Sequence, residues 1–262
     1  MFRLLKLSKA WKTRSGRVSE TRMTERVRVQ KAIAHAGLMS RRSAEEAIAS
    51  GRVAIDGRTA ILGDRVDVSA EVVTIDGAPI PLRPDTETHL LYKPVGVIST
   101  ATDPQGRQTV IDLIDSEARL YPVGRLDADS EGLLLISNDG ELTERVTHPR
   151  YGITKKYLVE INGKVRAGDV RRLEAGVELS DGPARAVKAR IVDRLGDRTQ
   201  VELIMGEGRN REVRRMVEAI GYETKRLVRT AIGPLTDPNL KPGQSRLLTT
   251  SEVVDLMKSS SR

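Results

Sequence analysis

From residue 24 onward, apolar side chains recur at the spacing of a helix face. They do so in VRVQKAIAHAG (27–37), and the run stops at Gly37. Ser40 is a typical N-cap for a second run, RRSAEEAIAS (41–50), which Gly51 ends. The pattern predicts two short helices at the start of the folded part of the chain.

The next segments alternate apolar and polar residues, as strands do. RVAIDGRTA (52–60) and EVVTIDGAPI (71–80) each contain an Asp-Gly pair, which is typical of a tight hairpin turn. Three prolines then fall within a few residues of each other, which favours a semi-stiff linker over 81–88. We therefore expect a first unit at 24–80 and a second at 89–252.

The second unit alternates groups of strands with single helices. Predicted strands are 89–93, 96–100, 132–137, 155–161, 189–193, 199–205 and 225–232, and predicted helices are 109–114, 140–148, 167–176 and 211–221. Because the strands come several at a time, without regular βαβ alternation, the fold class is α+β with a mixed, largely antiparallel sheet and flanking helices. Residues 253–262 are expected to be a polar tail.

The amino-acid composition limits the kinds of catalytic and metal site that the chain can form. A length of 262 residues suits one large or two modest domains, and no apolar run reaches the roughly 18 residues of a membrane span, so a soluble protein is expected. The absence of cysteine excludes disulfides, thiolate metal sites and a thiol nucleophile, and three scattered histidines argue against zinc. Catalysis would depend on carboxylates, hydroxyls, Tyr, Lys or Arg.

The net charge of +8 is concentrated at the amino terminus. Residues 1–22 carry +6 of it, so nucleic-acid binding must be argued from local patches elsewhere. The basic tail at 1–23 is an RNA-binding arm, an organelle transit peptide, or an extension upstream of a true start at Met23. We expect a cytoplasmic protein, or an organellar one if the tail is a transit peptide.

The first unit has a basic surface. On the second helix Ala44, Ala47 and Ile48 share one face, so Arg42 lies roughly opposite and is free for phosphate, although a solvated charged face is the plainer interpretation. The run GLMSRRSAEEAIASGRVAIDG (37–57) resembles the RNA-binding domain first known from ribosomal protein S4. That resemblance implies RNA contacts, for which the candidates are Lys31, Arg41, Arg42 and Arg52.

A second informative run is YPVGRLDADSEGLLLISNDGEL (121–142). It begins like a calcium-binding loop at Asp127, but the twelfth place is Asn138 and residues 133–136 form an apolar strand, so we reject a calcium site. From the residues alone, Asp127 could simply form a side-chain turn before that strand.

The same run closely resembles the signature of pseudouridine synthases, in which the Asp of a G-R-L-D turn is the catalytic carboxylate. Further segments resemble that family in the same order: 92–100, 103–114, 147–163, 206–221 and 226–235. The resemblance covers residues 24–252 and is greatest to the branch that modifies single sites in ribosomal RNA. It implies an isomerase with Asp127 at its centre.

The run GEGRNREVRRM (206–216) is best interpreted as a loop and a helix, because Arg211 breaks the dinucleotide-binding pattern that its glycines begin. A buried stripe from Val213 to Ile220 places Arg211 and Arg215 away from the core and Arg214 on the flank, with Asn210 as the expected cap. The resemblance implies that the flank residue, Arg214, pairs with the catalytic Asp.

The resemblance also implies roles for other residues. Tyr157 matches the family's active-site tyrosine, although an ordinary half-buried strand tyrosine is the plainer alternative. Arg125 is the candidate to fill the gap left by an extruded uridine. Arg209, Arg211, Lys155 and Lys156 are candidate phosphate contacts.

Conversion of uridine to pseudouridine involves no redox change, so neither cofactor nor metal is expected. The partner is ribosomal RNA or an assembly particle, the large-subunit 23S RNA is favoured over the small-subunit 16S RNA, and a monomer is expected. Two rival functions are a catalytically silent RNA-binding factor in ribosome assembly and a glycosidase or nucleosidase that hydrolyses the same bond.

Overall fold

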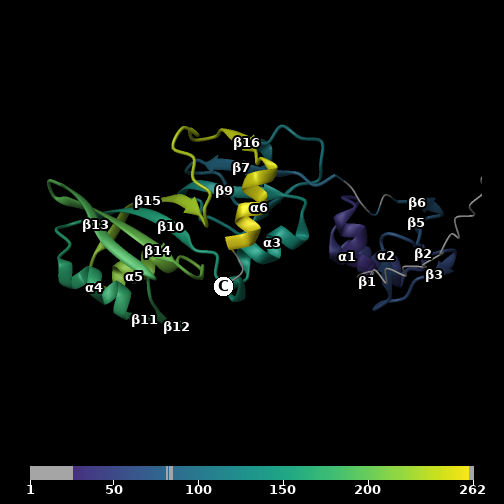
Figure 1. Cartoon of the computed structure of the whole chain (residues 1–262), viewed down its shortest axis with the longest axis horizontal. Helices are drawn as coiled ribbons and strands as arrows, with labels where there is room; N and C mark the ends of the chain where they lie inside the picture. The colour runs from purple at the N-terminus through teal and green to yellow at the C-terminus, as the bar shows by residue number, and fades with distance from the viewer. Residues whose placement is uncertain (1–25, 81, 83–84, 260–262) are drawn as a thin grey trace, which may run out of the picture.

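The protein is described by a computed structural model covering residues 26–80, 82 and 85–259 (Figure 1). The basic tail predicted at 1–23 lies outside these residues, and so does part of the linker predicted at 81–88. Among the described residues, no helix is long and apolar enough to cross a membrane.

The first unit packs two helices against short strands. Its elements are β1 (Arg26–Arg28), α1 (Val29–His35), α2 (Arg41–Ala49), β2 (Val53–Ile55), β3 (Arg58–Thr59), β4 (Arg65–Asp67), β5 (Val73–Ile75) and β6 (Ala78–Pro79). As predicted, the hydroxyl of Ser40 caps α2 by accepting the Ser43 N–H at 3.0 Å. Both Asp-Gly pairs adopt positive φ and turn the hairpins β2–β3 and β5–β6.

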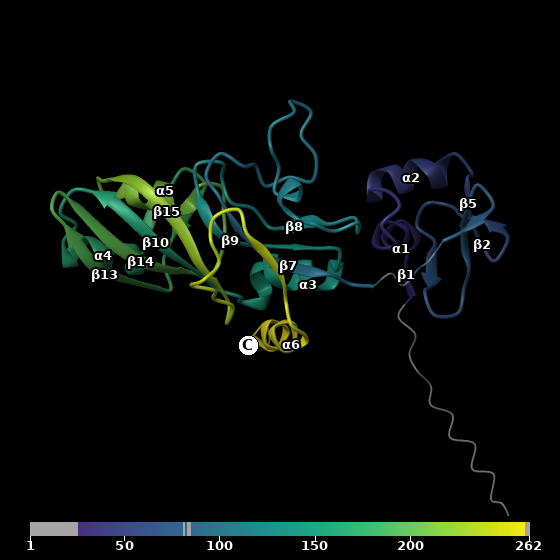
Figure 2. The same ribbon diagram turned by 90° about the horizontal axis from the view of Figure 1, so that it is seen from above.

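The second unit is built on one long, curved sheet (Figures 1 and 2). Its strands run in the order β13-β14-β10-β15-β9-β7-β16, with β8 beside β9, and only the β15–β9 pair among the described strands is parallel. The bounds are β7 (Thr88–Lys93), β8 (Tyr121–Val123), β9 (Glu131–Ser137), β10 (Lys155–Asn162), β13 (Lys188–Leu195), β14 (Arg198–Met205), β15 (Glu223–Ile232) and β16 (Ser245–Leu247). The predicted α+β class is confirmed.

Two helix pairs cover the two halves of this sheet. The remaining elements are α3 (Gly140–Thr147), α4 (Ala167–Ala175), α5 (Glu212–Ala219), α6 (Thr250–Ser259), the short hairpin β11 (Val177–Leu179) and β12 (Gly182–Ala184), and two 3-10 turns at Ile111–Leu113 and Pro149–Tyr151. Helices α4 and α5 pack on the half formed by β10, β13, β14 and β15, whereas α3 and α6 pack on the half containing β7 and β9 (Figure 2). The halves meet at β9 and β15.

Gly132 allows strands β9 and β15 to approach each other closely. It has φ +110, and a Cβ at this position would overlap the backbone of Arg229, with the nitrogen only 2.6 Å away. Since no other residue type lacks a Cβ, the parallel pairing of β9 and β15 depends on glycine here.

Three predicted elements differ in the structure. Residues 96–100 make a single bridge, from Ile98 to Thr109, instead of a strand, and the helix predicted at 109–114 is reduced to the turn Ile111–Leu113. Of the expected polar tail at 253–262, residues 253–259 instead belong to α6, whose Leu256 is fully buried, and residues 260–262 lie outside the described residues. Leu256 packs with Leu90, which lies far away in the sequence, so local polarity did not reveal its burial.

Candidate active site

Asp127 lies on a turn between β8 and β9, which we call the Asp127 turn (residues 124–130). Residues 96–100 hold this turn in place: the Ser99 hydroxyl donates to the Leu126 carbonyl at 2.7 Å and accepts the Leu126 N–H at 3.1 Å. The Gly96 N–H donates to the Ala128 carbonyl at 2.7 Å. The predicted strand at 96–100 therefore serves as a clamp on the Asp127 turn.

A buried lysine supports the turn from behind. Lys93 is fully buried at the end of β7, and its Nζ donates to the Ser130 carbonyl at 2.7 Å and to the Pro94 carbonyl at 2.9 Å. Burial lowers the pKa of Lys93 to about 8, and the nearby carboxylates of Asp127 and Asp129 oppose that shift. Lys93 was not among the residues predicted from the sequence, although a charged residue in an apolar strand was a usable signal.

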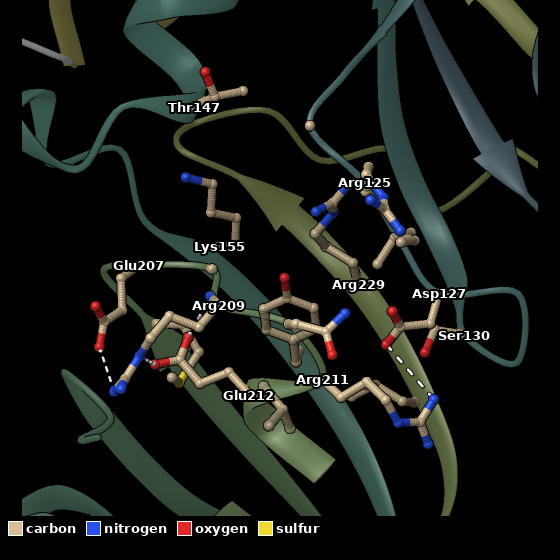
Figure 3. A pocket seen from close by; sticks show the side chains of 18 of the residues that line it. Arg125, Asp127, Ser130, Thr147, Lys155, Glu207, Arg209, Arg211, Glu212 and Arg229 are labelled. Carbon is tan, nitrogen blue, oxygen red and sulfur yellow. Dashed lines mark hydrogen bonds and ion pairs between the residues drawn. The ribbon is translucent and has the colours of Figure 1, made fainter. Parts of the chain in front are cut away.

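The Asp127 turn forms one wall of a cavity of about 330 Å³ (Figure 3). Strands β10 and β15 supply its floor, and the loop before α5, residues 207–211, supplies the opposite wall. Tyr157 of β10 lines the floor and is 8% exposed. This volume falls at the lower end of the range for small-molecule sites, which suits one nucleoside-sized group.

Arg211 supplies the cation beside Asp127. Its Nη1 lies 4.0 Å from Asp127 Oδ2 and 3.1 Å from Asp129 Oδ2 (Figure 3). Arg211 adopts φ +49 as the N-cap of α5 and offers no side-chain cap, so the prediction that Asn210 caps this helix is wrong. This left-handed backbone, which is uncommon outside glycine, directs Arg211 to the Asp127 turn instead of outward.

Arg214 binds the same turn at a different point. Its Nη2 donates to the Asp129 carbonyl at 2.8 Å and to the Ser130 hydroxyl at 3.3 Å, and lies 3.4 Å from the Asp129 carboxylate. The expected pairing with Asp127 is therefore replaced by a pairing with Asp129. Arg214 is 7% exposed and its Nε is buried without a partner, so a desolvated cation is fixed beside the turn.

The other predicted RNA contacts near the cavity divide into two groups. Arg125 is exposed at the cavity wall, where it is free to meet a substrate. Arg209 is engaged within the protein: it pairs with Asp181, Glu207 and Glu212 and donates to the Gly182 and Pro183 carbonyls. These contacts use its donors, so the structure does not favour Arg209 as a phosphate contact.

The candidate RNA contacts in the first unit also differ in whether they already pair with a carboxylate. Arg52 is bound to Asp76, which competes with any phosphate. Lys31, Arg41 and Arg42 make no ion pair within the described part of the chain, and Lys31 and Arg41 line a second cavity of about 390 Å³. Helices α1 and α2 thus present basic groups that a polyanion can reach.

Over residues 26–80, 82 and 85–259, no group of three or more His, Asp or Glu side chains is arranged to hold a metal ion.

Comparison with known proteins agrees with this architecture. Residues 87–219 match the family profile described as RNA pseudouridylate synthase, and residues 27–72 match the S4 domain. A crystal structure titled as a pseudouridylate synthase superimposes with a TM-score of 0.63 at 28% identity, covering 88% of this chain and 99% of the other. Fold and site therefore define an RNA-modifying enzyme of the pseudouridine synthase class.

Two individual relatives support the assignment of the chain to a family. An uncharacterized RNA pseudouridine synthase of Mycobacterium tuberculosis is 43% identical, over 90% of this chain and 95% of the relative. The ribosomal large subunit pseudouridine synthase B of Bacillus subtilis is 41% identical, over 86% of this chain and 93% of the relative. The chain belongs to the RNA pseudouridine synthase family, and it carries the S4 domain as predicted.

Proposed function

We propose that the protein converts one uridine of large-subunit ribosomal RNA to pseudouridine, with Asp127 as the catalytic carboxylate. The observation that carries this proposal is the position of Asp127 on a clamped turn, in the wall of a nucleoside-sized cavity and beside Arg211. The choice of RNA is supported by relatives at 40–41% identity that are named ribosomal large subunit pseudouridine synthase B.

The reaction breaks the bond between ribose C1′ and uracil N1 and joins C1′ to uracil C5. An ionised carboxylate beside the ribose assists either as a nucleophile at C1′ or as a base. Asp127 is suited to both roles, because its side chain is only partly exposed (26%) and it faces the cavity. Product and substrate are isomers, so no electron donor or energy source enters the reaction.

Two arginines support the proposed role of Asp127, one through its charge and one by positioning the turn. Arg211 places a positive charge 4.0 Å from the carboxylate, which stabilises its ionised form against the desolvation caused by a bound nucleoside. Arg214 holds the backbone of residues 129 and 130, so it fixes the direction in which Asp127 points. Arg214 thus acts as a positioning residue in the free enzyme.

A uridine within folded RNA must leave its stack before it can reach this cavity, at a cost of a few kcal/mol. The ring of Tyr157 on the cavity floor provides an apolar surface for the extruded uracil. Arg125, an exposed residue of the Asp127 turn, would occupy the position that the base has left. The S4 domain would hold the surrounding RNA through Lys31, Arg41 and Arg42.

The proposal is tested with ribosomal RNA labelled with tritium at uracil C5, because rejoining through C5 releases that tritium. Purified protein is incubated separately with large-subunit RNA, small-subunit RNA and the corresponding ribosomal particles. We expect release from large-subunit RNA or its particle. Release from small-subunit RNA alone would overturn the target, free uracil as a product would indicate a hydrolase, and binding without release from any RNA would indicate a silent assembly factor.

A further inference from the structure

Two cations in the cavity, the buried Arg229 and the partly buried Lys155, have no ion-pair partner among the described residues and no role in the mechanism described so far. Arg229 of β15 is 5% exposed; its Nε donates to the Leu133 carbonyl at 2.6 Å, while its Nη2 is buried without a partner. Lys155 of β10 donates from Nζ to the carbonyls of Val146 and Ile153, both at 2.9 Å. Both side chains line the cavity that contains Asp127.

Sheet geometry places these cations around Tyr157. Lys155 and Tyr157 are two residues apart on β10, so their side chains lie on the same face of the sheet, and Arg229 is the residue paired with Tyr157 on β15. Figure 3 shows Lys155 and Arg229 on the side of the cavity away from Arg211 and Glu212. A base lying on the Tyr157 ring would therefore have both cations as neighbours.

The charges of these two cations are not neutralised by a direct ion pair within the described residues. Burial and, to a smaller extent, the positive charge of Arg229 together lower the pKa of Lys155 to about 8, and no carboxylate opposes the shift. Lys155 is still protonated at neutral pH. In the described residues neither cation has an ion-pair partner, and burying unpaired like charges costs stability. A site of this kind is suited to negative charge supplied by the substrate.

The limited exposure of these two cations indicates which part of the target nucleotide contacts them. A target nucleotide is joined to a phosphate on each side, so its phosphates stay where the chain enters and leaves the cavity. Arg229 is only 5% exposed, so we expect it to meet the base, which is the part of the nucleotide that enters the cavity. The base is also the group that becomes negatively charged during the reaction.

We propose that Lys155 and Arg229 are catalytic residues that stabilise the negative charge on uracil when it separates from the ribose. This inference rests on the proposed isomerase function. Breakage of the C1′–N1 bond leaves its electron pair on uracil, where N1 and the carbonyl oxygens share it. After the ring turns, C5 forms the new bond to C1′ with an electron pair of the anion; the C5 proton is then lost and N1 gains a proton.

The test compares two leaving groups under single-turnover conditions with saturating enzyme. Target RNA carries either uridine or 5-fluorouridine, whose fluorinated base is the more stable anion, and conversion of the target nucleoside is measured by digestion and mass spectrometry. Any conversion of 5-fluorouridine counts, because it requires the C1′–N1 bond to break. Arg229→Gln and Lys155→Met should each slow uridine about 10²- to 10³-fold, as loss of a charge-stabilising donor does, and slow 5-fluorouridine clearly less.

Controls separate the possible failures. Arg229→Lys, which keeps the charge, should recover part of the rate, and Arg190→Gln on the exposed strand β13 should leave it unchanged. Equal slowing of both substrates would overturn the inference. A weaker RNA affinity with an unchanged single-turnover rate would also overturn it and indicate a phosphate contact. If Arg229→Gln does not fold, Lys155→Met carries the test. An inactive wild-type enzyme would instead contradict the proposed function.

Discussion

Lys93 shows how a single buried charge organises the site. Its Nζ ties the Ser130 carbonyl at the end of the Asp127 turn to the Pro94 carbonyl that follows β7. Replacing it would leave two buried carbonyls without a donor, each costing about 1–3 kcal/mol. Lys93 is therefore expected to fix the Asp127 turn. Burial of its positive charge, however, lowers the stability of the chain.

That cost predicts a specific pH dependence. The folded-state pKa of Lys93 is about 8, below the ordinary 10.5, so the unfolded state binds more protons between these values and stability rises with pH. The penalty is fully present below pH 8 and disappears as pH passes 10.5. Urea unfolding of wild type and Lys93→Met at pH 7.5 and 9.5 should show wild type gaining relative stability at pH 9.5. Equal differences at the two pH values would contradict the buried, charged lysine.

At the level of single residues, the sequence predicted Asp127 because the GRLD turn resembles a family signature. It could not predict which arginine approaches Asp127, since that depends on the left-handed backbone of Arg211. Arg229 was missed for a different reason. Its burial follows from the close approach of β15 to β9, which no local pattern encodes.

Among the elements, the junction of β9 and β15 connects the two halves of the sheet. Gly132→Ala would place a Cβ against the backbone of Arg229 and force an alanine to φ +110. Overpacking and backbone strain together should lower the free energy of unfolding by at least about 2 kcal/mol. Thermal or urea denaturation measures this loss.

The matched control is Gly168→Ala, which lies in helix α4 and has only the end of the Arg171 side chain near the new Cβ, at 3.8 Å. Alanine is favoured over glycine within helices, so this variant should be as stable as wild type or more so. If both variants retain wild-type stability, the β9–β15 contact does not have the close geometry described.

Alternation of apolar and polar residues identified most strands correctly because their two faces meet different surroundings, as β10 and β14 show. Segment 96–100 has strand-like composition but finds a pairing partner only at Ile98, and its polar groups clamp the Asp127 turn instead. Helix α6 was missed because its burial depends on distant partners such as Leu90 and Ile232.

On the scale of the whole molecule, the two units divide binding from chemistry. Lys31, Arg41 and Arg42 make no ion pair within residues 26–80, 82 and 85–259, so joint replacement by Gln should remove about three phosphate contacts. The slope of log affinity against log salt should then fall by roughly 2 to 3. Filter binding to ribosomal RNA over a salt series measures it.

The control replaces Arg26 and Arg58, which already pair with Glu71 and Asp64 in the same unit. These variants should leave the salt slope nearly unchanged. An unchanged slope in the triple variant would contradict an RNA-docking role for helices α1 and α2.

The linker prolines and the change in periodicity predicted the two-unit organisation, whereas the joining of the sheet halves required the structure.

Asp127 is the proposed catalytic carboxylate of the isomerisation. Tritium release from C5-labelled large-subunit ribosomal RNA or its particle tests it most directly, with Asp127→Asn compared against wild type and against Asp197→Asn, a carboxylate that is 95% exposed. We expect release by wild type and Asp197→Asn, no release by Asp127→Asn, and similar RNA affinity for all three. Release by Asp127→Asn would show that this carboxylate is not required for the isomerisation.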